Sequence, residues 1–157
     1  MMQPRNLLDV PSDAVPPLEP GHYEALDDQV GFQLRIAMQR HTAIFMSRMV
    51  AGLTQTQFAA LAKLLEAGPC SQNQLGRLIY LDAATIKGVV DRLGARGFIT
   101  TTADPEDRRR LAVTLTDAGR KVTEMALRVA AEITRATLLP LTPEERRRFV
   151  ELLKKIA

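Results

Sequence analysis

The side chains that most often carry enzyme chemistry are few in this chain and are not grouped. Its 157 residues include one cysteine, Cys70, and two histidines, His22 and His41. Their spacing matches no zinc motif, and the sequence contains no glycine-rich phosphate loop and no nucleophile elbow. We therefore predict no catalytic residues, no metal and no cofactor, and a protein that is not an enzyme.

Basic residues offer a different kind of chemistry. Three consecutive arginines, Arg108–Arg110, follow a turn signal at Asp104–Pro105. The formal charge is +3, but residues 1–31 hold six acidic residues and one arginine, so they carry −5 and the rest carries +8. A basic body suits a polyanion such as DNA, because Lys and Arg release counterions from phosphates. Charge alone leaves open a solvated basic surface without a partner.

The elements that must position these residues are mostly helices. Apolar residues make up 46% of the chain and aromatic residues only 4%, with no Trp, so the core must consist of small aliphatic side chains and Met. Residues 98–102 and 111–115 are rich in β-formers and predict a hairpin. Helical periodicity and Ser, Thr or Asp caps predict helices over 23–51, 55–66, 72–79, 83–96 and 117–139, and from 143 onward.

Two short consecutive helices followed by a basic hairpin are typical of a winged helix-turn-helix. The expected fold class is mainly α with a small β-hairpin wing. We expect a proline-rich acidic arm over residues 1–22 and one domain over 23–157, in which 53–115 binds DNA. With one cysteine, no signal-peptide pattern and no membrane-length apolar run, we expect a cytoplasmic protein.

Several segments at matching spacing resemble the MarR family of transcription regulators. The motifs that carry the resemblance are Leu81–Ile86, Val90–Leu93, Arg96–Ile99, Asp104–Arg110 and Leu115–Gly119. The resemblance implies a homodimer, joined through 23–51 and 116–157, that binds a pseudo-palindromic operator. It also implies repression as the usual outcome, often relieved by a small ligand or an oxidant.

The expected DNA contacts lie in three places. In the helix that follows Asp82, the stripe of Ile86, Val89, Val90 and Leu93 must face the core, which turns small and polar residues outward. The alternatives are a solvated helix surface and a turn whose charges pair with one another. The candidate DNA-binding residues are Ser71, Gln72 and Gln74 before this helix, Ala84, Thr85, Lys87, Gly88 and Arg92 on it, and Asp107, Arg108 and Arg109 in the wing.

A small effector is expected to bind beside the first helix. Residues 33–41 resemble the corresponding segment of regulators of aromatic-acid catabolism, whose effectors include aromatic acids and aryl-CoA thioesters. In this interpretation Arg35 pairs with a carboxylate and His41 binds a phenol or a carbonyl group, although each candidate could instead be an ordinary core or interface residue. The candidate ligand-binding residues are Arg35, Met38, Gln39, His41, Thr42 and Phe45.

Two further hypotheses stay open at this point. Cys70 precedes the Ser71 cap, where a helix N-terminus could lower the thiol pKa and create an oxidation sensor. Alternatively, the helices could form a dimer scaffold for a non-DNA protein-interaction module.

Overall fold

The computed structural model describes residues 25–103 and 111–156. The predicted arm over 1–22 and the wing residues Asp107, Arg108 and Arg109 lie outside the described residues. The elements are η1 (Leu26–Asp28), α1 (Val30–Arg48), η2 (Val50–Gly52), α2 (Gln55–Ala67), α3 (Gln72–Leu78), α4 (Ala83–Ala95), β1 (Ile99–Ala103), β2 (Leu111–Leu115), α5 (Asp117–Thr137) and α6 (Pro143–Ile156).

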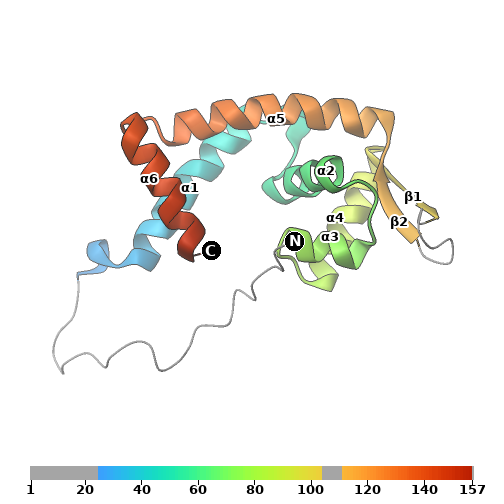
Figure 1. Ribbon diagram of the computed structural model, residues 1–157, viewed down its shortest axis with the longest axis horizontal. Helices are drawn as coiled ribbons and strands as arrows, with labels where there is room; N and C mark the ends of the chain where they lie inside the picture. The colour runs from blue at the N-terminus through green and yellow to red at the C-terminus, as the bar shows by residue number, and fades with distance from the viewer. Residues whose placement is uncertain (1–24, 104–110, 157) are drawn as a thin grey trace, which may run out of the picture.

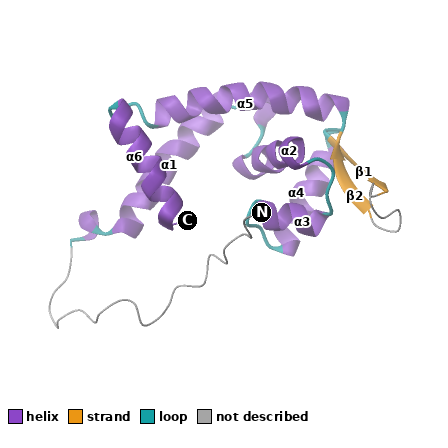
Figure 2. Ribbon diagram, viewed as in Figure 1, coloured by secondary structure: helices purple, strands orange, loops and turns teal. Residues whose placement is uncertain are grey.

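The long helix α5 joins two halves of the molecule. It runs along the top of Figure 1, with α1 and α6 at one end and with α2, α3, α4 and the hairpin at the other. Both α1 and α2 pack against α5, and α3 packs against α4. Figure 2 shows the two strands beside the helices of the second half. The predicted order of helices and hairpin is therefore confirmed.

Side-chain caps begin the helices where the sequence predicts them. The Thr54 hydroxyl accepts a hydrogen bond from the Gln57 backbone N–H, and the Gln57 side chain accepts one from the Thr54 N–H, which completes a capping box. Thr142 and Glu145 form the same reciprocal pair at the start of α6. Single caps are made by Ser71, Asp82 and Thr116.

The first predicted helix, over 23–51, is shorter and broken. Regular α-helix covers only Val30–Arg48, flanked by the short 3-10 turns η1 and η2. Ala51 and Gly52 have φ values of 54° and 57°, and this left-handed pair ends the helical path before α2. The hairpin also starts one residue later than predicted, with Ile99 opposite Leu115. Cys70 adds an isolated bridge to Val113 that the sequence analysis did not predict.

The hydrophobic core lies in the half that carries α2, α3 and α4. Leu53, Leu61, Leu75, Ile86 and Leu93 are fully buried there. The predicted inward stripe of α4 is confirmed, with Val90 half-buried at its margin. At the other end α1 buries only Phe45, and α6 buries no residue completely. Among the described residues, no helix is both long and apolar enough to cross a membrane.

Candidate DNA interface and effector pocket

The outward face of α4 carries the polar residues expected to meet DNA. Ala84, Thr85, Lys87 and Arg92 are exposed, while Gly88 is half-buried. A Cβ atom added at Gly88 would lie 3.3 Å from a guanidinium nitrogen of Arg92, so the arginine side chain folds back over this glycine. Gly88 therefore leaves room for Arg92 to lie close to the helix surface.

Two hydrogen-bonded pairs limit which groups this face can offer. The Lys87 ammonium lies 2.6 Å from the Asp91 carboxylate one turn later. The Asp82 carboxylate accepts both the Thr85 backbone N–H at 2.8 Å and the Thr85 hydroxyl at 2.7 Å. These hydrogen bonds lower the pKa of Asp82, because they favour its charged form. With its hydroxyl hydrogen used in this way, Thr85 has its methyl group and its oxygen lone pairs left for a partner.

The helix before α4 contributes fewer free groups. The Gln74 N–H donates to the Ser71 hydroxyl at 3.2 Å, so the cap satisfies it. The Gln74 side chain is exposed, and Gln72 is half-buried. Tyr80, in the turn between α3 and α4, has a positive φ of 57° and is 58% exposed. The sequence analysis did not include Tyr80 among the candidate DNA-binding residues. Its position in the turn just before α4 was the one signal that could have suggested it.

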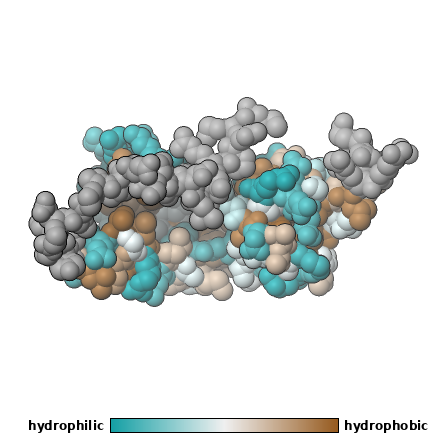
Figure 3. Space-filling model, turned by 90° about the horizontal axis from the view of Figure 1, so that it is seen from below, coloured by the Kyte–Doolittle hydropathy of each residue, from teal (hydrophilic) through white to brown (hydrophobic). Residues whose placement is uncertain are grey.

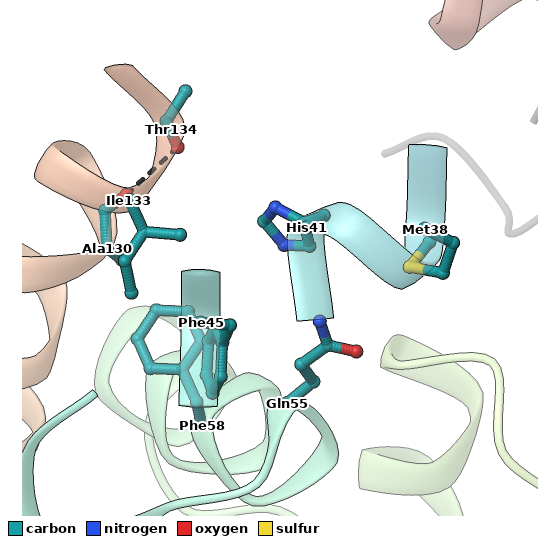
Figure 4. Close-up of a pocket in the computed structure, with 8 residues that line it drawn as sticks. All are labelled: Met38, His41, Phe45, Gln55, Phe58, Ala130, Ile133 and Thr134. Atoms are coloured by element: carbon teal, nitrogen blue, oxygen red, sulfur yellow. Dashed lines mark hydrogen bonds between the residues drawn. The ribbon is translucent and has the colours of Figure 1, made fainter. Parts of the chain in front are cut away.

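A pocket opens where α1, α2 and α5 meet. Figure 4 shows the side chains of His41 and Phe45 from α1 together with Phe58 of α2 and Ile133 of α5. The His41 Nδ1 atom lies 2.9 Å from the Thr137 hydroxyl, and the rings of Phe45 and Phe58 are 6.0 Å apart. The pocket holds about 240 Å³ and is lined by Met38, His41, Phe45, Gln55, Phe58, Ala130, Ile133 and Thr134.

The six candidate ligand-binding residues divide between two places. Met38, His41 and Phe45 line this pocket. Arg35, Gln39 and Thr42 line a neighbouring groove on α1, which Met38 also borders. The Arg35 guanidinium lies 5.0 Å above the Phe32 ring. Sequence reasoning missed the walls from α2 and α5, because nothing in local spacing reveals which distant segments face α1.

Cys70 occupies a structural position. The residue is buried, and its backbone exchanges two hydrogen bonds with Val113, at 3.2 Å and 2.8 Å. Burial raises the pKa of the Cys70 thiol, the opposite of what a reactive thiolate needs. A buried thiol with a raised pKa argues against an oxidation sensor at Cys70.

Comparison with known proteins agrees with this arrangement. Residues 53–111 match the model of the MarR family. The repressor NicR of Pseudomonas putida is 39% identical over 147 residues, which are 93% of this chain and 91% of NicR.

Two solved structures are also similar. A probable transcriptional regulator from Pseudomonas aeruginosa is 53% identical, with a TM-score of 0.81 over 85% of this chain and 100% of that one. BpsR of Bordetella bronchiseptica, whose DNA binding is regulated by 6-hydroxynicotinic acid, is 40% identical, with a TM-score of 0.79 over 86% of this chain and 97% of BpsR. The chain therefore belongs to the MarR family of winged-helix transcription regulators.

Proposed function

We propose that this regulator is a homodimeric repressor that is released from its operator by a single-ring aromatic carboxylic acid. The observation that carries the proposal is the pocket between α1, α2 and α5, which has apolar walls and a few polar groups. Ligand sites of this composition bind a ring through their walls and orient it through hydrogen bonds. BpsR and NicR support the proposal, since one is regulated by an aromatic acid and the other is a repressor.

The pocket volume favours a small acid over a CoA thioester. About 240 Å³ lies below the roughly 300–1,000 Å³ of sites for drug-sized ligands. One aromatic ring with its substituents fits such a volume, whereas the nucleotide of a CoA thioester would have to lie outside. None of the residues that line the pocket is a lysine or an arginine, so nothing in its wall matches the phosphates of CoA.

His41 is the polar group best placed to orient the acid. Its Nδ1 faces the Thr137 hydroxyl, and that contact fixes the ring between α1 and α5. When Thr137 donates to Nδ1, the ring proton resides on Nε2, which then donates to an oxygen of the ligand. Arg35 lines the neighbouring groove and is the residue that the sequence analysis expects to pair with the ligand carboxylate.

Operator binding is proposed to use α4 in the major groove, with Ser71, Gln72 and Gln74 on the preceding helix beside the phosphates. On α4 the reading residues would be Ala84, Thr85, Lys87, Gly88 and Arg92, since this face turns away from the core. In the wing, Arg108 and Arg109 would contact the flanking groove, and Asp107 would orient Arg109. We also propose that the exposed apolar residues of α1 and α6 join two copies, which would set the two α4 helices about 34 Å apart.

Calorimetric titration with 6-hydroxynicotinic acid tests the effector assignment. We expect the wild-type protein to bind this acid. His41→Phe should weaken binding about tenfold, because it removes the hydrogen bond from His41 to the charged ligand. Arg40→Ala is the matched control, because Arg40 is exposed at the position of α1 just before His41 and lines neither the pocket nor the groove. We expect it to bind normally.

A second titration uses p-coumaroyl-CoA. Binding of this thioester without binding of the free acid would contradict the proposed effector class and favour the aryl-CoA alternative.

The affinity for DNA should fall steeply as the salt concentration rises, because phosphate contacts release counterions. A flat salt response would favour the protein-interaction module instead.

A further inference from the structure

Arg96, at the C-terminal end of α4, reaches the junction between α1 and α2. One guanidinium nitrogen donates to the backbone carbonyl of Ala51, and the other lies 3.5 Å from the side-chain oxygen of Gln57. The guanidinium also lies 4.7 Å from the centre of the Phe98 ring. One side chain therefore joins α4, the η2 turn and the first turn of α2, which are 39 to 45 residues away in sequence.

The junction that Arg96 holds has an unusual backbone. Ala51 and Gly52 are consecutive residues with positive φ, and Ala51 pays the steric cost that glycine avoids. Gln57 is 6% exposed, and its side-chain oxygen also accepts the Thr54 N–H at 3.1 Å. Arg96 thus binds to the same oxygen that completes the capping box of α2.

The first turns of α2 also form a wall of the pocket. Gln55 and Phe58, on either side of Gln57, line it, and the Phe58 ring packs against Phe45 of α1. The Gln55 amide lies 3.4 Å from the Thr42 hydroxyl. A ligand that displaces this wall would act on the same turns of α2 that carry Gln57, one of the two residues to which Arg96 is bound.

We propose that Arg96 is the positioning residue that fixes α4 relative to the pocket wall and transmits a change in that wall to α4. The proposal rests on the proposed function only in naming the acid as the natural cause of such a change. Leu61 of α2 and Leu93 of α4 belong to one apolar core, and apolar packing has no preferred direction, whereas the Arg96 hydrogen bonds fix both distance and direction. The charge on the guanidinium strengthens these hydrogen bonds.

A double-mutant cycle tests this coupling without any ligand. Phe58→Leu changes the pocket wall conservatively, Arg96→Met removes the guanidinium, and amide hydrogen exchange over Ala83–Ala95 reports the state of α4. We expect Phe58→Leu to raise exchange in α4 several-fold in the wild-type background and by less than about twofold in the Arg96→Met background. Equal effects in both backgrounds, or no effect in either, would overturn the proposal.

Two further variants separate positioning from general stability. Arg128→Met is the matched control, since Arg128 is exposed on α5, and its Phe58→Leu response should equal that of the wild type. Arg96→Lys keeps the charge and one donor group, so it should restore part of the response. A response unchanged by Arg96→Met while the melting temperature falls would show that Arg96 only stabilises the fold, and would reject the proposal.

A ligand experiment then links this coupling to regulation. With a duplex selected by the wild-type protein from a random 30-base-pair pool, we expect 6-hydroxynicotinic acid to weaken DNA binding about tenfold. For Arg96→Met we expect a change below about twofold, with the affinity for the acid unchanged. If the wild type does not bind the acid, the proposed effector is wrong, and the exchange cycle still decides the role of Arg96.

Discussion

At the scale of single residues, hydrogen bonds inside the protein decide which groups remain for a partner. Thr85 and Lys87 are both exposed on α4, and both are polar residues of the kind that reads DNA. Thr85 nevertheless donates its hydroxyl hydrogen to Asp82, while Lys87 is paired with Asp91. Lys87 can exchange its partner for DNA, because the pair is exposed and such pairs are weak. Thr85 stays hydrogen-bonded to the capping residue Asp82, so it can offer DNA its methyl group and its oxygen lone pairs but no hydroxyl hydrogen.

We therefore expect Thr85 to read a thymine methyl group. Thr85→Ser should lower affinity for the selected duplex about fivefold, which is the lower end of the range of affinity lost with one base contact. Thr85→Val keeps the methyl group and should lower affinity less than about twofold. Replacing every thymine of the duplex by deoxyuridine should weaken wild-type binding and leave Thr85→Ser unchanged. Fluorescence anisotropy measures each of these affinities. A greater loss for Thr85→Val than for Thr85→Ser would show that the hydroxyl makes the contact.

At the scale of elements, the start of α5 is locked to the end of α4 and the hairpin. The Thr116 backbone N–H donates to the Phe98 carbonyl at 3.1 Å, and its hydroxyl donates to the Gly97 carbonyl at 2.6 Å. The same hydroxyl caps α5 by accepting the Gly119 N–H at 3.0 Å. This junction fixes the start of α5 relative to α4 and the hairpin.

Gly119 permits that junction. A Cβ atom at this position would lie 1.8 Å from the Phe98 carbonyl oxygen, so the backbones of α5 and residue 98 would have to separate. We expect Gly119→Ala to lower the free energy of unfolding by about 2–3 kcal/mol, as overpacking does. Urea denaturation followed by circular dichroism measures this change.

Gly94→Ala provides the matched control for Gly119. Gly94 lies in α4, where an added Cβ would meet no atom within 4 Å. The same substitution there should leave stability unchanged or raise it by up to about 1 kcal/mol, because alanine favours a helix. Equal losses of stability at the two positions would refute the close approach of α5 to residue 98.

At the scale of the whole molecule, the end with α2, α3 and α4 buries its apolar side chains, whereas the end with α1 and α6 leaves many of them exposed. The described part of α6 exposes Phe149, Val150, Leu152 and Ile156, the last at 69%. On α1, Leu34, Ile36, Met38 and Met46 are exposed as well. Figure 3 shows apolar patches at this end of the molecule, interspersed with polar ones. Exposed apolar surface of this kind is a mark of a protein interface, and the proposed second copy would cover it.

Charging this surface should break the proposed dimer. We expect the double variant Leu152→Glu and Ile156→Glu to sediment as a monomer, because burying two carboxylates in an apolar contact is costly. Affinity for the selected duplex should fall about 100-fold or more, since two half-sites would no longer be bound together. Arg147→Glu, on the opposite side of α6, is the control and should remain dimeric. A dimeric double variant would place the interface elsewhere.

The sequence by itself determined the order of helices and hairpin, the capping residues and the inward stripe of α4. These features depend on neighbours within a few residues, and local backbone chemistry and periodicity encode them directly. It also predicted Met38, His41 and Phe45 as ligand-binding residues, and these three line the pocket between α1, α2 and α5.

Only the tertiary structure decided what those residues meet. Three contacts join segments that are distant in sequence. They are the pocket walls from Phe58 and Ile133, the bridge from Cys70 to Val113, and the hydrogen bond of Arg96 to the η2 turn. The positive φ of Ala51 likewise has no signal in the residue type, because alanine is compatible with a helix, and the η2 turn that it forms lies against α5. Packing between distant segments has no local signature, so the sequence showed which groups were available and the fold showed how they are combined.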